Sequence, residues 1–153
     1  MKVAPLCRAL SQEGWHNYSI VHTGQHYDDG LSGIFFNELQ VPAAQYRLDV
    51  TEDDPALRLG MMVEGIGKII HHLRPDAVIV VGDVDSTLAG ALAARKKDCF
   101  LVHIEAGLRS FDRSMPEEIN RMLTDAAADS LMTTGDIANS NLLREGVDPT
   151  RII

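Results

Sequence analysis

Charged and polar side chains follow three predicted strands, at the point where each strand ends. They occupy residues 23–26, 82–87 and 103–109. In a parallel sheet the carboxyl ends of all strands lie at one edge, and ligands bind in the crevice outside it. This topology would gather Asp83, Glu105, His26 and Arg109 along one rim. Several carboxylates on one rim favour proton transfer on a neutral or anionic small molecule.

Helix capping is an alternative role for the carboxylates that precede helices. Asp83 fits capping and function equally well, whereas Asp85 or Ser86 is a natural N-cap for the helix that follows. Ser114 and Glu117 fit a capping box, with Ser at the N-cap and Glu three residues later. A capping box would explain Glu117 without any catalytic role.

The other rim residues also have structural interpretations. Glu105 could form an ion pair with Arg109, four residues further along the chain. His26 could be an ordinary histidine in a surface loop. His103 lies within a predicted buried strand, so we expect a hydrogen-bonded core residue rather than a catalytic one.

Sequence motifs for several other kinds of chemistry are absent. The chain has no Gly-x-Gly-x-x-Gly dinucleotide motif, no P-loop and no Gly-x-Ser-x-Gly nucleophile elbow. Its two cysteines, Cys7 and Cys99, are too few for a disulfide framework or a thiolate metal site. We therefore expect no dinucleotide cofactor and no metal site, and two reduced thiols in a cytoplasmic protein.

Alternating segments of helical and strand character must position these residues. We expect helices over residues 3–10, 30–39, 55–73, 86–95, 116–128 and 136–145, and strands over 18–22, 46–50, 77–81, 100–104 and 130–133. The apolar strands 77–81 and 100–104 are typical of strands buried on both faces of a parallel sheet. The alternation predicts an α/β fold, with helices packed around a parallel sheet.

Two helices carry apolar residues that we expect to face the core. In helix 55–73 these residues recur at helical spacing and predict packing on the sheet. They are Leu59, Met62, Val63, Ile66, Ile69, Ile70 and Leu73. In helix 116–128 the residues expected to point inward are Ile119, Met122, Leu123 and Ala126.

Length and charge limit the classes of partner. The chain has 153 residues, the size of one domain, with 45% hydrophobic and 24% charged residues. Its formal net charge of -8 disfavours binding to nucleic acid or an anionic membrane. The longest apolar run, residues 77–81, is too short to span a bilayer, and no signal peptide is visible. Small molecules and a second copy of the chain are the expected partners.

Both ends of the chain read as cut. Doubly wound domains usually begin on a strand, whereas this chain opens on a helix. It closes on Ile152 and Ile153, which read as the start of an unfinished strand. A missing first strand would expose one edge of the sheet or leave a gap within it.

Three motifs of the sequence resemble those of a known family. Residues 103–121, HIEAGLRSFDRSMPEEINR, closely resemble the most distinctive segment of the non-hydrolysing UDP-N-acetylglucosamine 2-epimerases. Residues 23–26, TGQH, and 82–90, GDVDSTLAG, resemble two further family motifs in the same order. The resemblance covers essentially the whole chain.

The resemblance implies a fold and a reaction. Family members consist of two Rossmann-like domains in the GT-B arrangement, each with helices on both faces of a parallel sheet. They interconvert UDP-GlcNAc and UDP-ManNAc by eliminating UDP and adding it back, without a cofactor or a metal. By this resemblance Asp83, Glu105 and Glu117 are the essential carboxylates. Lys2 contacts the nucleotide, and Arg109 assists the diphosphate.

The resemblance also implies what else the complete enzyme contains. His26 lies in a motif that some family members use at a second, regulatory UDP-GlcNAc site. The Gly-Thr-Arg-Pro-Glu segment expected before Met1 and the C-terminal UDP-binding domain are absent from residues 1–153. We therefore expect a partial N-terminal domain that lacks its first strand, inactive alone. The intact enzyme is expected to form a homodimer, to bind a UDP-sugar and to serve polysaccharide synthesis.

Three other functions remain open at this point. A hydrolysing epimerase would share the fold and the carboxylates but release free ManNAc. A retaining GT-B glycosyltransferase would need an acceptor and would leave UDP-GlcNAc alone unchanged. A non-catalytic remnant would only bind a nucleotide sugar or a partner.

Overall fold

The computed structural model describes residues 3–15, 17–24 and 41–153. Its helices are α1 (Val3–Gln12), α3 (Pro55–Leu73), α4 (Asp85–Lys96), α5 (Pro116–Ala127) and α6 (Asp136–Arg144), with a 3-10 turn at Pro149–Arg151. Its strands are β1 (Val21–His22), β2 (Tyr46–Arg47), β3 (Ala77–Val81), β4 (Phe100–Ala106) and β5 (Ser130–Thr133). Most predicted elements are confirmed, although β1 and β2 are shorter than expected. The predicted helix 30–39 lies outside the described residues.

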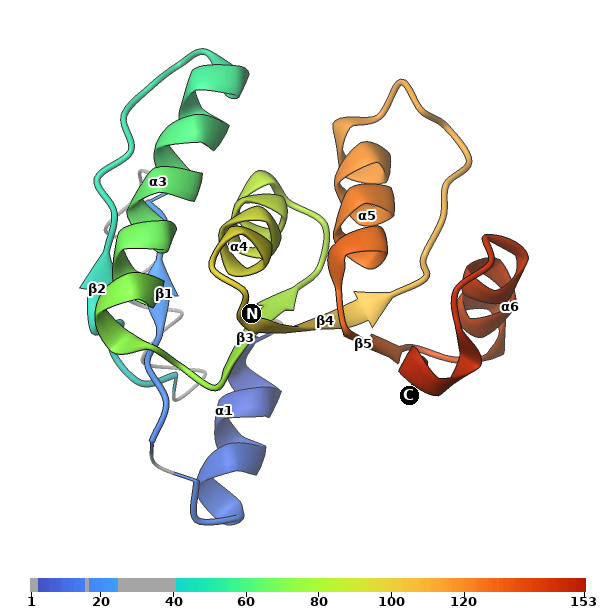
Figure 1. Cartoon of the computed structure of the whole chain (residues 1–153), viewed down its shortest axis with the longest axis horizontal. Helices are drawn as coiled ribbons and strands as arrows, with labels where there is room; N and C mark the ends of the chain where they lie inside the picture. The colour runs from blue at the N-terminus through green and yellow to red at the C-terminus, as the bar shows by residue number, and fades with distance from the viewer. Residues whose placement is uncertain (1–2, 16, 25–40) are drawn as a thin grey trace.

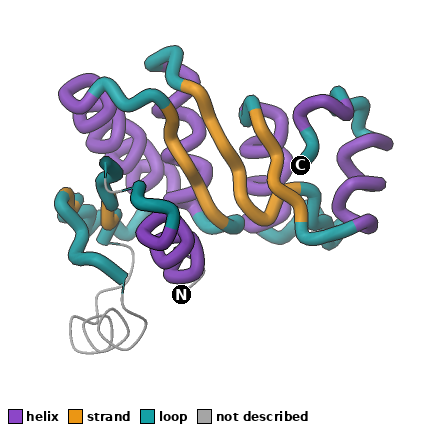
Figure 2. The backbone as a smooth tube through the Cα atoms, turned by 90° about the horizontal axis from the view of Figure 1, so that it is seen from below, coloured by secondary structure: helices purple, strands orange, loops and turns teal. Residues whose placement is uncertain are grey.

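The strands of the described residues form two separate parallel sheets. One has the order β3-β4-β5 and the other pairs β1 with β2. Helices α4 and α5 lie on one side of the three-stranded sheet, and α1 lies on the opposite side (Figures 1 and 2). Parallel strands with helices on both sides confirm the predicted α/β class.

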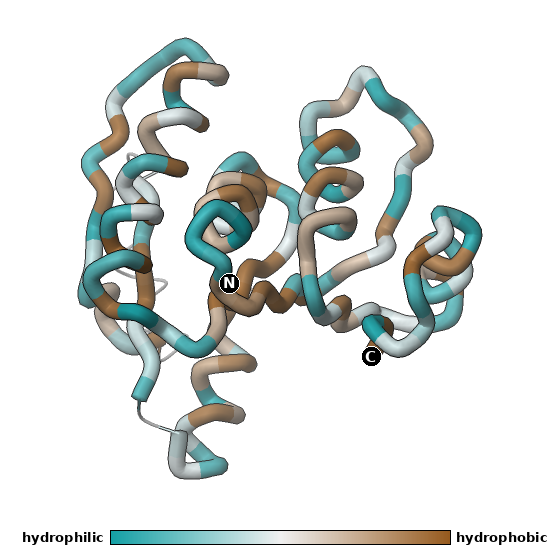
Figure 3. The backbone as a smooth tube through the Cα atoms, in the orientation of Figure 1, coloured by the Kyte–Doolittle hydropathy of each residue, from teal (hydrophilic) through white to brown (hydrophobic). Residues whose placement is uncertain are grey.

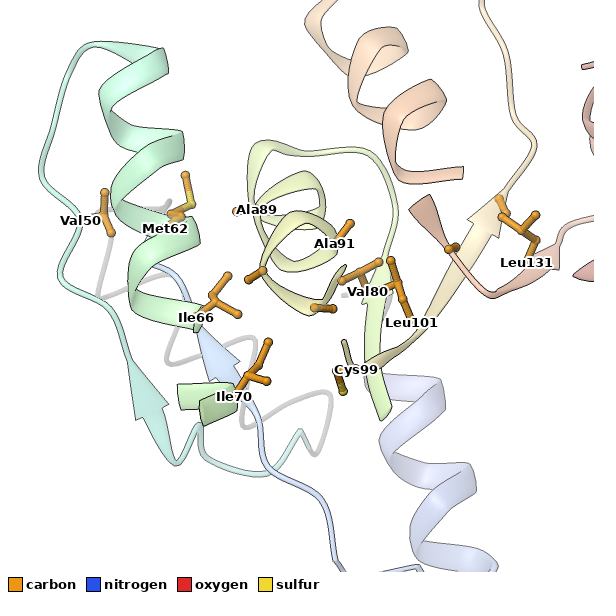
Figure 4. Packing of buried hydrophobic residues seen from close by; sticks show 14 of the residues in the cluster. Val50, Met62, Ile66, Ile70, Val80, Ala89, Ala91, Cys99, Leu101 and Leu131 are labelled. Carbon is orange, nitrogen blue, oxygen red and sulfur yellow. The ribbon is translucent and has the colours of Figure 1, made fainter. Parts of the chain in front are cut away.

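The core lies between α4 and the sheet, and small residues of α4 make this packing close. Ala89, Ala91 and Ala94 are fully buried, and a Cβ atom added at Gly90 would lie 2.8 Å from Val80 Cγ1. Leu101 of β4 completes the contact from the sheet side. Figure 4 shows these side chains between the elements, and Figure 3 shows the hydrophobic residues running through the central strands.

Helix α3 packs mainly on α4, so the prediction that it packs on the sheet is wrong. Its buried residues Met62, Ile66 and Ile70 turn toward the α4 side, whereas Leu73 at its end is exposed. The helix begins as expected from Pro55, because the Asp54 carboxylate accepts hydrogen bonds from the next free backbone amides. The alanine-rich α4 is thin enough to fill the space between α3 and the strands.

Helix α5 buries a polar face, which contradicts the predicted apolar one. Leu123 is 49% exposed and Ala126 is exposed, while Ile119 and Met122 are half-buried. The buried residues are Glu118, Asn120, Thr124 and Asp125. The reason is that α5 covers the carboxyl ends of β3 and β4, where backbone and side-chain polar groups need partners.

The end of the chain, which the sequence predicts to be the start of a strand, lies beside β5. Ile152 forms a parallel bridge with Leu131, and the Ile153 backbone amide donates to the Leu131 carbonyl at 2.8 Å. The pairing is limited to an isolated bridge.

Within the part of the chain that the structure describes, no helix has the length and apolar character needed to cross a membrane.

The packing of α3 on α4 gives a stability prediction with an internal control. Met62 is fully buried, whereas its neighbour Met61 is 43% exposed. Met62→Ala should lower the free energy of unfolding by about 2–5 kcal/mol, because it leaves a cavity in the core. Met61→Ala should change it by less than about 0.5 kcal/mol. Urea denaturation followed by circular dichroism measures both, and equal effects would contradict the packing described.

Candidate active site

Strands β3 and β4 end side by side, as the parallel topology predicts. Val81 is in register with Ile104, and the Gly82 amide donates to the Ile104 carbonyl at 3.0 Å. Asp83 and Glu105 each follow directly on these paired positions. The first turn of α5, which carries Glu117, packs against the same region through the residues described next. Asp83 and Glu105 therefore belong to one rim, and α5, which carries Glu117, is hydrogen-bonded to it.

Asp83 is held by α5 and caps no helix. Its carboxylate oxygen Oδ2 accepts from Arg121 Nε at 3.1 Å and from Arg121 Nη2 at 2.5 Å. Asn120 Nδ2 donates to the Asp83 carbonyl at 3.0 Å. The N-cap of α4 is Val84, which makes no side-chain capping bond, so the capping role of Asp83 is excluded.

The predicted N-cap role of Asp85 or Ser86 is wrong as well. Asp85 is the first helical residue of α4, and its carboxylate faces two other helices. It accepts from Arg58 Nη2 at 3.4 Å and from Asn120 Nδ2 at 3.1 Å. Asn120 thus bonds to the backbone of Asp83 and the side chain of Asp85 together, which fastens α5 to the start of α4.

Glu105 has a strained backbone. Its φ is 71°, in the left-handed region that side chains other than glycine rarely adopt. The β4–β5 pairing shifts register between Ile104 and Ala106, so Glu105 sits in a bulge. A bulge changes the direction of a side chain at the end of a strand, and such strain is concentrated at functional sites.

Glu117 does not belong to a capping box, which corrects the sequence prediction. The N-cap of α5 is Met115, and it makes no side-chain capping bond. The Ser114 hydroxyl instead donates to Asp112 Oδ1 at 2.6 Å. Glu117 lies half-buried in the first turn of α5 without a capping partner to explain it, so capping offers no structural account of this carboxylate.

Sequence reasoning missed Glu118, which organises the loop before α5. Its buried carboxylate accepts from the Ser110 amide at 2.9 Å, the Phe111 amide at 3.1 Å and Arg121 Nη1 at 3.0 Å. Burial raises the pKa of Glu118, but these hydrogen bonds together outweigh burial and leave the pKa below its ordinary value. The i,i+3 spacing to Arg121 was the available signal in the sequence.

Arg109 points into the protein and does not pair with Glu105. Its side chain is 1% exposed, with Nη1 2.7 Å from Asp125 Oδ2 and Nη2 2.6 Å from Glu145 Oε2. The predicted Glu105–Arg109 ion pair is therefore wrong. The expectation that Arg109 assists the diphosphate stays a prediction, and the burial of its guanidinium between two carboxylates weighs against it.

A second buried cluster joins the ends of β3 and β4. His103, which is fully buried, lies with Nδ1 2.6 Å from Asp125 Oδ1 and Nε2 2.8 Å from the Gly82 carbonyl. The Gly107 amide donates to Asp125 Oδ2 at 3.1 Å. The prediction of a hydrogen-bonded core histidine is confirmed. Sequence reasoning missed the buried role of Asp125, because an acidic residue in an amphipathic helix is ordinarily assigned to the exposed face.

The remaining predicted binding residues, Lys2 and His26, lie outside the described residues. Within residues 3–15, 17–24 and 41–153, no group of three or more His, Cys, Asp and Glu side chains could hold a metal ion. The chemistry available at the described rim is acid–base chemistry by carboxylates, with Arg121 fixing the orientation of Asp83.

The strain at Glu105 predicts an unusual order of stabilities. Glu105→Gly should be more stable than Glu105→Ala by about 1 kcal/mol, because glycine adopts a positive φ without a steric cost. The same pair of substitutions at Glu117, in the first turn of α5, should give the opposite order, since alanine favours helices. Urea denaturation of the four variants measures this. Alanine being favoured at both positions would contradict the strain.

The contacts of Glu118 predict a dependence of stability on pH. A lowered pKa in the folded state means that this carboxylate contributes fully above its ordinary value of 4.5. The contribution is lost as the pH falls through the lowered pKa. Glu118→Gln should therefore cost about 1–3 kcal/mol at neutral pH and progressively less in acid. Glu13→Gln, beyond the end of α1, is the control, and a cost independent of pH would contradict the assignment.

Comparisons with known proteins agree on one family. A family model described as UDP-N-acetylglucosamine 2-epimerase matches residues 8–153. The UDP-N-acetylglucosamine 2-epimerase of Methanocaldococcus jannaschii is 44% identical over 154 residues, which cover 99% of this chain and 41% of that relative. The UDP-2,3-diacetamido-2,3-dideoxy-D-glucuronate 2-epimerase of Pseudomonas aeruginosa is 43% identical, over 97% of this chain and 42% of that relative.

Solved structures have the same fold. The M. jannaschii UDP-GlcNAc 2-epimerase in complex with UDP-GlcNAc and UDP matches with a TM-score of 0.93 and 44% identity, over 99% of this chain and 42% of that chain. The Neisseria meningitidis UDP-GlcNAc 2-epimerase bound to UDP-GlcNAc matches with a TM-score of 0.88 and 26% identity, over 99% and 42%. The chain thus spans less than half the length of these relatives. Because the family model matches nearly all of its residues, the chain belongs to the UDP-N-acetylglucosamine 2-epimerase family.

Proposed function

We propose that this chain is the N-terminal part of a non-hydrolysing UDP-N-acetylglucosamine 2-epimerase, which interconverts UDP-GlcNAc and UDP-ManNAc. Membership of the family supports the reaction type. The M. jannaschii and N. meningitidis relatives, whose structures contain UDP-GlcNAc, support the substrate. The coverage of 41% of the M. jannaschii relative supports a second, UDP-binding domain in the complete GT-B enzyme.

The observation that carries this proposal is the attachment of α5 to the end of β3. Arg121 binds the Asp83 carboxylate and Asn120 binds the Asp83 backbone, and both lie within one turn of Glu117. The strained Glu105 ends the adjacent strand. Carboxylates gathered at one rim, one of them oriented by an arginine, are an arrangement suited to proton transfer.

The chemistry needs proton transfer on both faces of one carbon. In the elimination a base takes the proton from C2, the C1–O bond to UDP breaks, and the electron pair forms the C1=C2 bond of a 2-acetamidoglucal. In the reverse step UDP attacks C1 and a proton is delivered to the opposite face of C2. Asp83, Glu105 and Glu117 are the groups proposed to move these protons and to help UDP leave and return.

The departing diphosphate needs positive charge, and the burial of the Arg109 side chain between Asp125 and Glu145 weighs against its supplying that charge. Lys2 is therefore the residue of this chain proposed to contact the nucleotide. A closed cleft between the two domains would exclude water and keep the glucal and UDP together.

His26 is proposed for a regulatory UDP-GlcNAc site, and a homodimer is proposed for the complete enzyme.

A second candidate substrate is favoured by one comparison. The P. aeruginosa relative, named for UDP-2,3-diacetamido-2,3-dideoxy-D-glucuronate, is 43% identical to this chain, against 44% for the M. jannaschii enzyme. Both compounds carry an acetamido group at C2 next to the UDP-bearing carbon, so the elimination is the same. The substituents at C3 and C5 distinguish them.

The decisive experiment is proton NMR in D2O with either UDP-sugar. It compares the 153-residue chain with the same chain extended at both ends by the corresponding segments of the M. jannaschii relative. We expect loss of the H2 signal and formation of the C2 epimer with the extended chain only. Asp83→Asn, Glu105→Gln and Glu117→Gln should each lower the rate by about 100-fold or more, since each removes a proton-transfer group. Glu64→Gln, on the exposed surface of α3, should leave the rate unchanged.

Other products would favour the alternative functions. Free ManNAc with UDP would mean a hydrolysing epimerase. Unchanged UDP-GlcNAc that reacts only when an acceptor sugar is added would mean a glycosyltransferase. Binding of UDP-GlcNAc without any exchange at C2 would mean a non-catalytic binding protein. Exchange and epimer formation by the 153-residue chain alone would contradict the need for a second domain.

A further inference from the structure

Asp125, a fully buried carboxylate of α5, has no part in the proposed proton transfers. The Asp125 side chain is 2% exposed, so it does not reach substrate. Both of its oxygens are nevertheless engaged. Oδ1 lies 2.6 Å from His103 Nδ1, and Oδ2 receives the Gly107 amide at 3.1 Å and the Arg109 guanidinium at 2.7 Å. Burying this ion pair costs desolvation energy, and packed apolar residues would often stabilise the fold as well.

These contacts reach the backbone on both sides of the rim. Through the His103 ring, Asp125 is linked to the Gly82 carbonyl, which directly precedes Asp83. Since a carbonyl only accepts, His103 Nε2 carries the hydrogen of that bond. Through its own Oδ2, Asp125 holds the amide of Gly107, two residues after Glu105. Figure 1 shows α5 beside α4 and over β4.

The turn at Gly107 is also fixed from its other side. Asn141 Nδ2 of α6 donates to the Gly107 carbonyl at 3.0 Å. The φ of Gly107 is 79°, and a Cβ atom there would lie 2.5 Å from the Ala138 carbonyl oxygen. The turn therefore has no freedom to adjust, and the Asp125 contact sets the position of β4's end relative to α5.

We propose that Asp125 is a positioning residue that sets the spacing of the three carboxylates, Asp83, Glu105 and Glu117. This inference rests on the proposed function. One buried carboxylate ties the loop of Asp83 through His103 and the loop of Glu105 through Gly107 to the helix that carries Glu117. The two half-reactions use carboxylates on opposite faces of the sugar, so their relative position decides whether the glucal is recaptured. A displacement of about 1 Å costs on the order of 100-fold in rate.

The test measures how the intermediate is partitioned. The extended chain is incubated with UDP-GlcNAc, and released UDP with 2-acetamidoglucal is quantified against UDP-ManNAc formed. Asp125→Asn and His103→Gln should raise this ratio by about 10-fold or more, because misplaced carboxylates eliminate UDP without returning it. The ratio is independent of how much protein is folded. His103→Gln interrupts the connection from Asp125 Oδ1 to the Gly82 carbonyl and keeps the Arg109 ion pair, so it serves if Asp125→Asn fails to fold.

Glu145→Gln is the matched control. It removes the other carboxylate of Arg109, which contacts neither His103 nor Gly107. It should leave the partition ratio unchanged. A lower overall rate with an unchanged ratio in Asp125→Asn and His103→Gln would overturn the proposal and leave Asp125 a stabilising residue only.

A second measurement separates this proposal from the proposed function. In nitrogen-15 spectra of the 153-residue chain, Asp125→Asn should shift the backbone amides of Gly107, Glu105 and Asp83, and His103→Gln those of Gly82 and Asp83. Glu145→Gln should shift only the surroundings of Arg109 and α6. Shifts confined to Gly107 in Asp125→Asn would overturn the link. If the extended chain lacks epimerase activity, the function fails while these spectra still decide whether Asp125 couples the two loops.

Discussion

The ends of two adjacent parallel strands present polar groups to the interior, and α5 must satisfy them. After β3 the Asp83 carbonyl accepts from Asn120 of α5, and after β4 the Gly107 amide donates to Asp125 of α5. A helix with an apolar inner face would leave these groups buried without partners, at a cost of about 1–3 kcal/mol each. Helix α5 therefore carries Asn120 and Asp125 on its inner face. The placement of α5, and with it of Glu117, depends on this requirement.

The same requirement explains why the rim is built from two linked polar clusters. Arg121 connects Asp83 to Glu118, which holds the loop before α5 through the amides of Ser110 and Phe111. Asp125 connects the ends of the two strands, because it contacts the His103 ring with one oxygen and the Gly107 amide with the other. Each cluster pairs carboxylates with an arginine, so the chain buries charge without leaving it isolated. Of the carboxylates proposed for catalysis, Asp83 belongs to the Arg121 cluster, which holds its side chain in place.

Ordinary packing fixes the rest of the fold. Small residues of α4 approach β3 closely, and α3 stacks on α4 through Met62, Ile66 and Ile70. This support is rigid because its contacts are apolar and tightly fitted. The rim by contrast includes a bulge with a positive φ at Glu105. A rigid support beside a strained residue is typical of a catalytic position, where the surrounding structure holds an unfavourable conformation in place.

The sequence by itself determined the order of elements, the buried strands β3 and β4, and the rim that follows them. Runs of apolar residues and polar residues at strand ends are local patterns, and parallel topology turns them into neighbours. The motifs in residues 103–121 also identified the family, which the family model bears out. Capping was not predictable in this way, since Val84 and Met115 start their helices without a side-chain bond.

Only the tertiary structure decided which partner each charge takes. Arg109 pairs with Asp125 and Glu145, 16 and 36 residues away in the chain, and not with the nearby Glu105. The polar face of α5 was likewise hidden, because helical periodicity identifies apolar stripes and assigns them to the core. The physical reason is that a buried charge is governed by the groups that surround it in space, and spacing along the chain describes those groups only within one element.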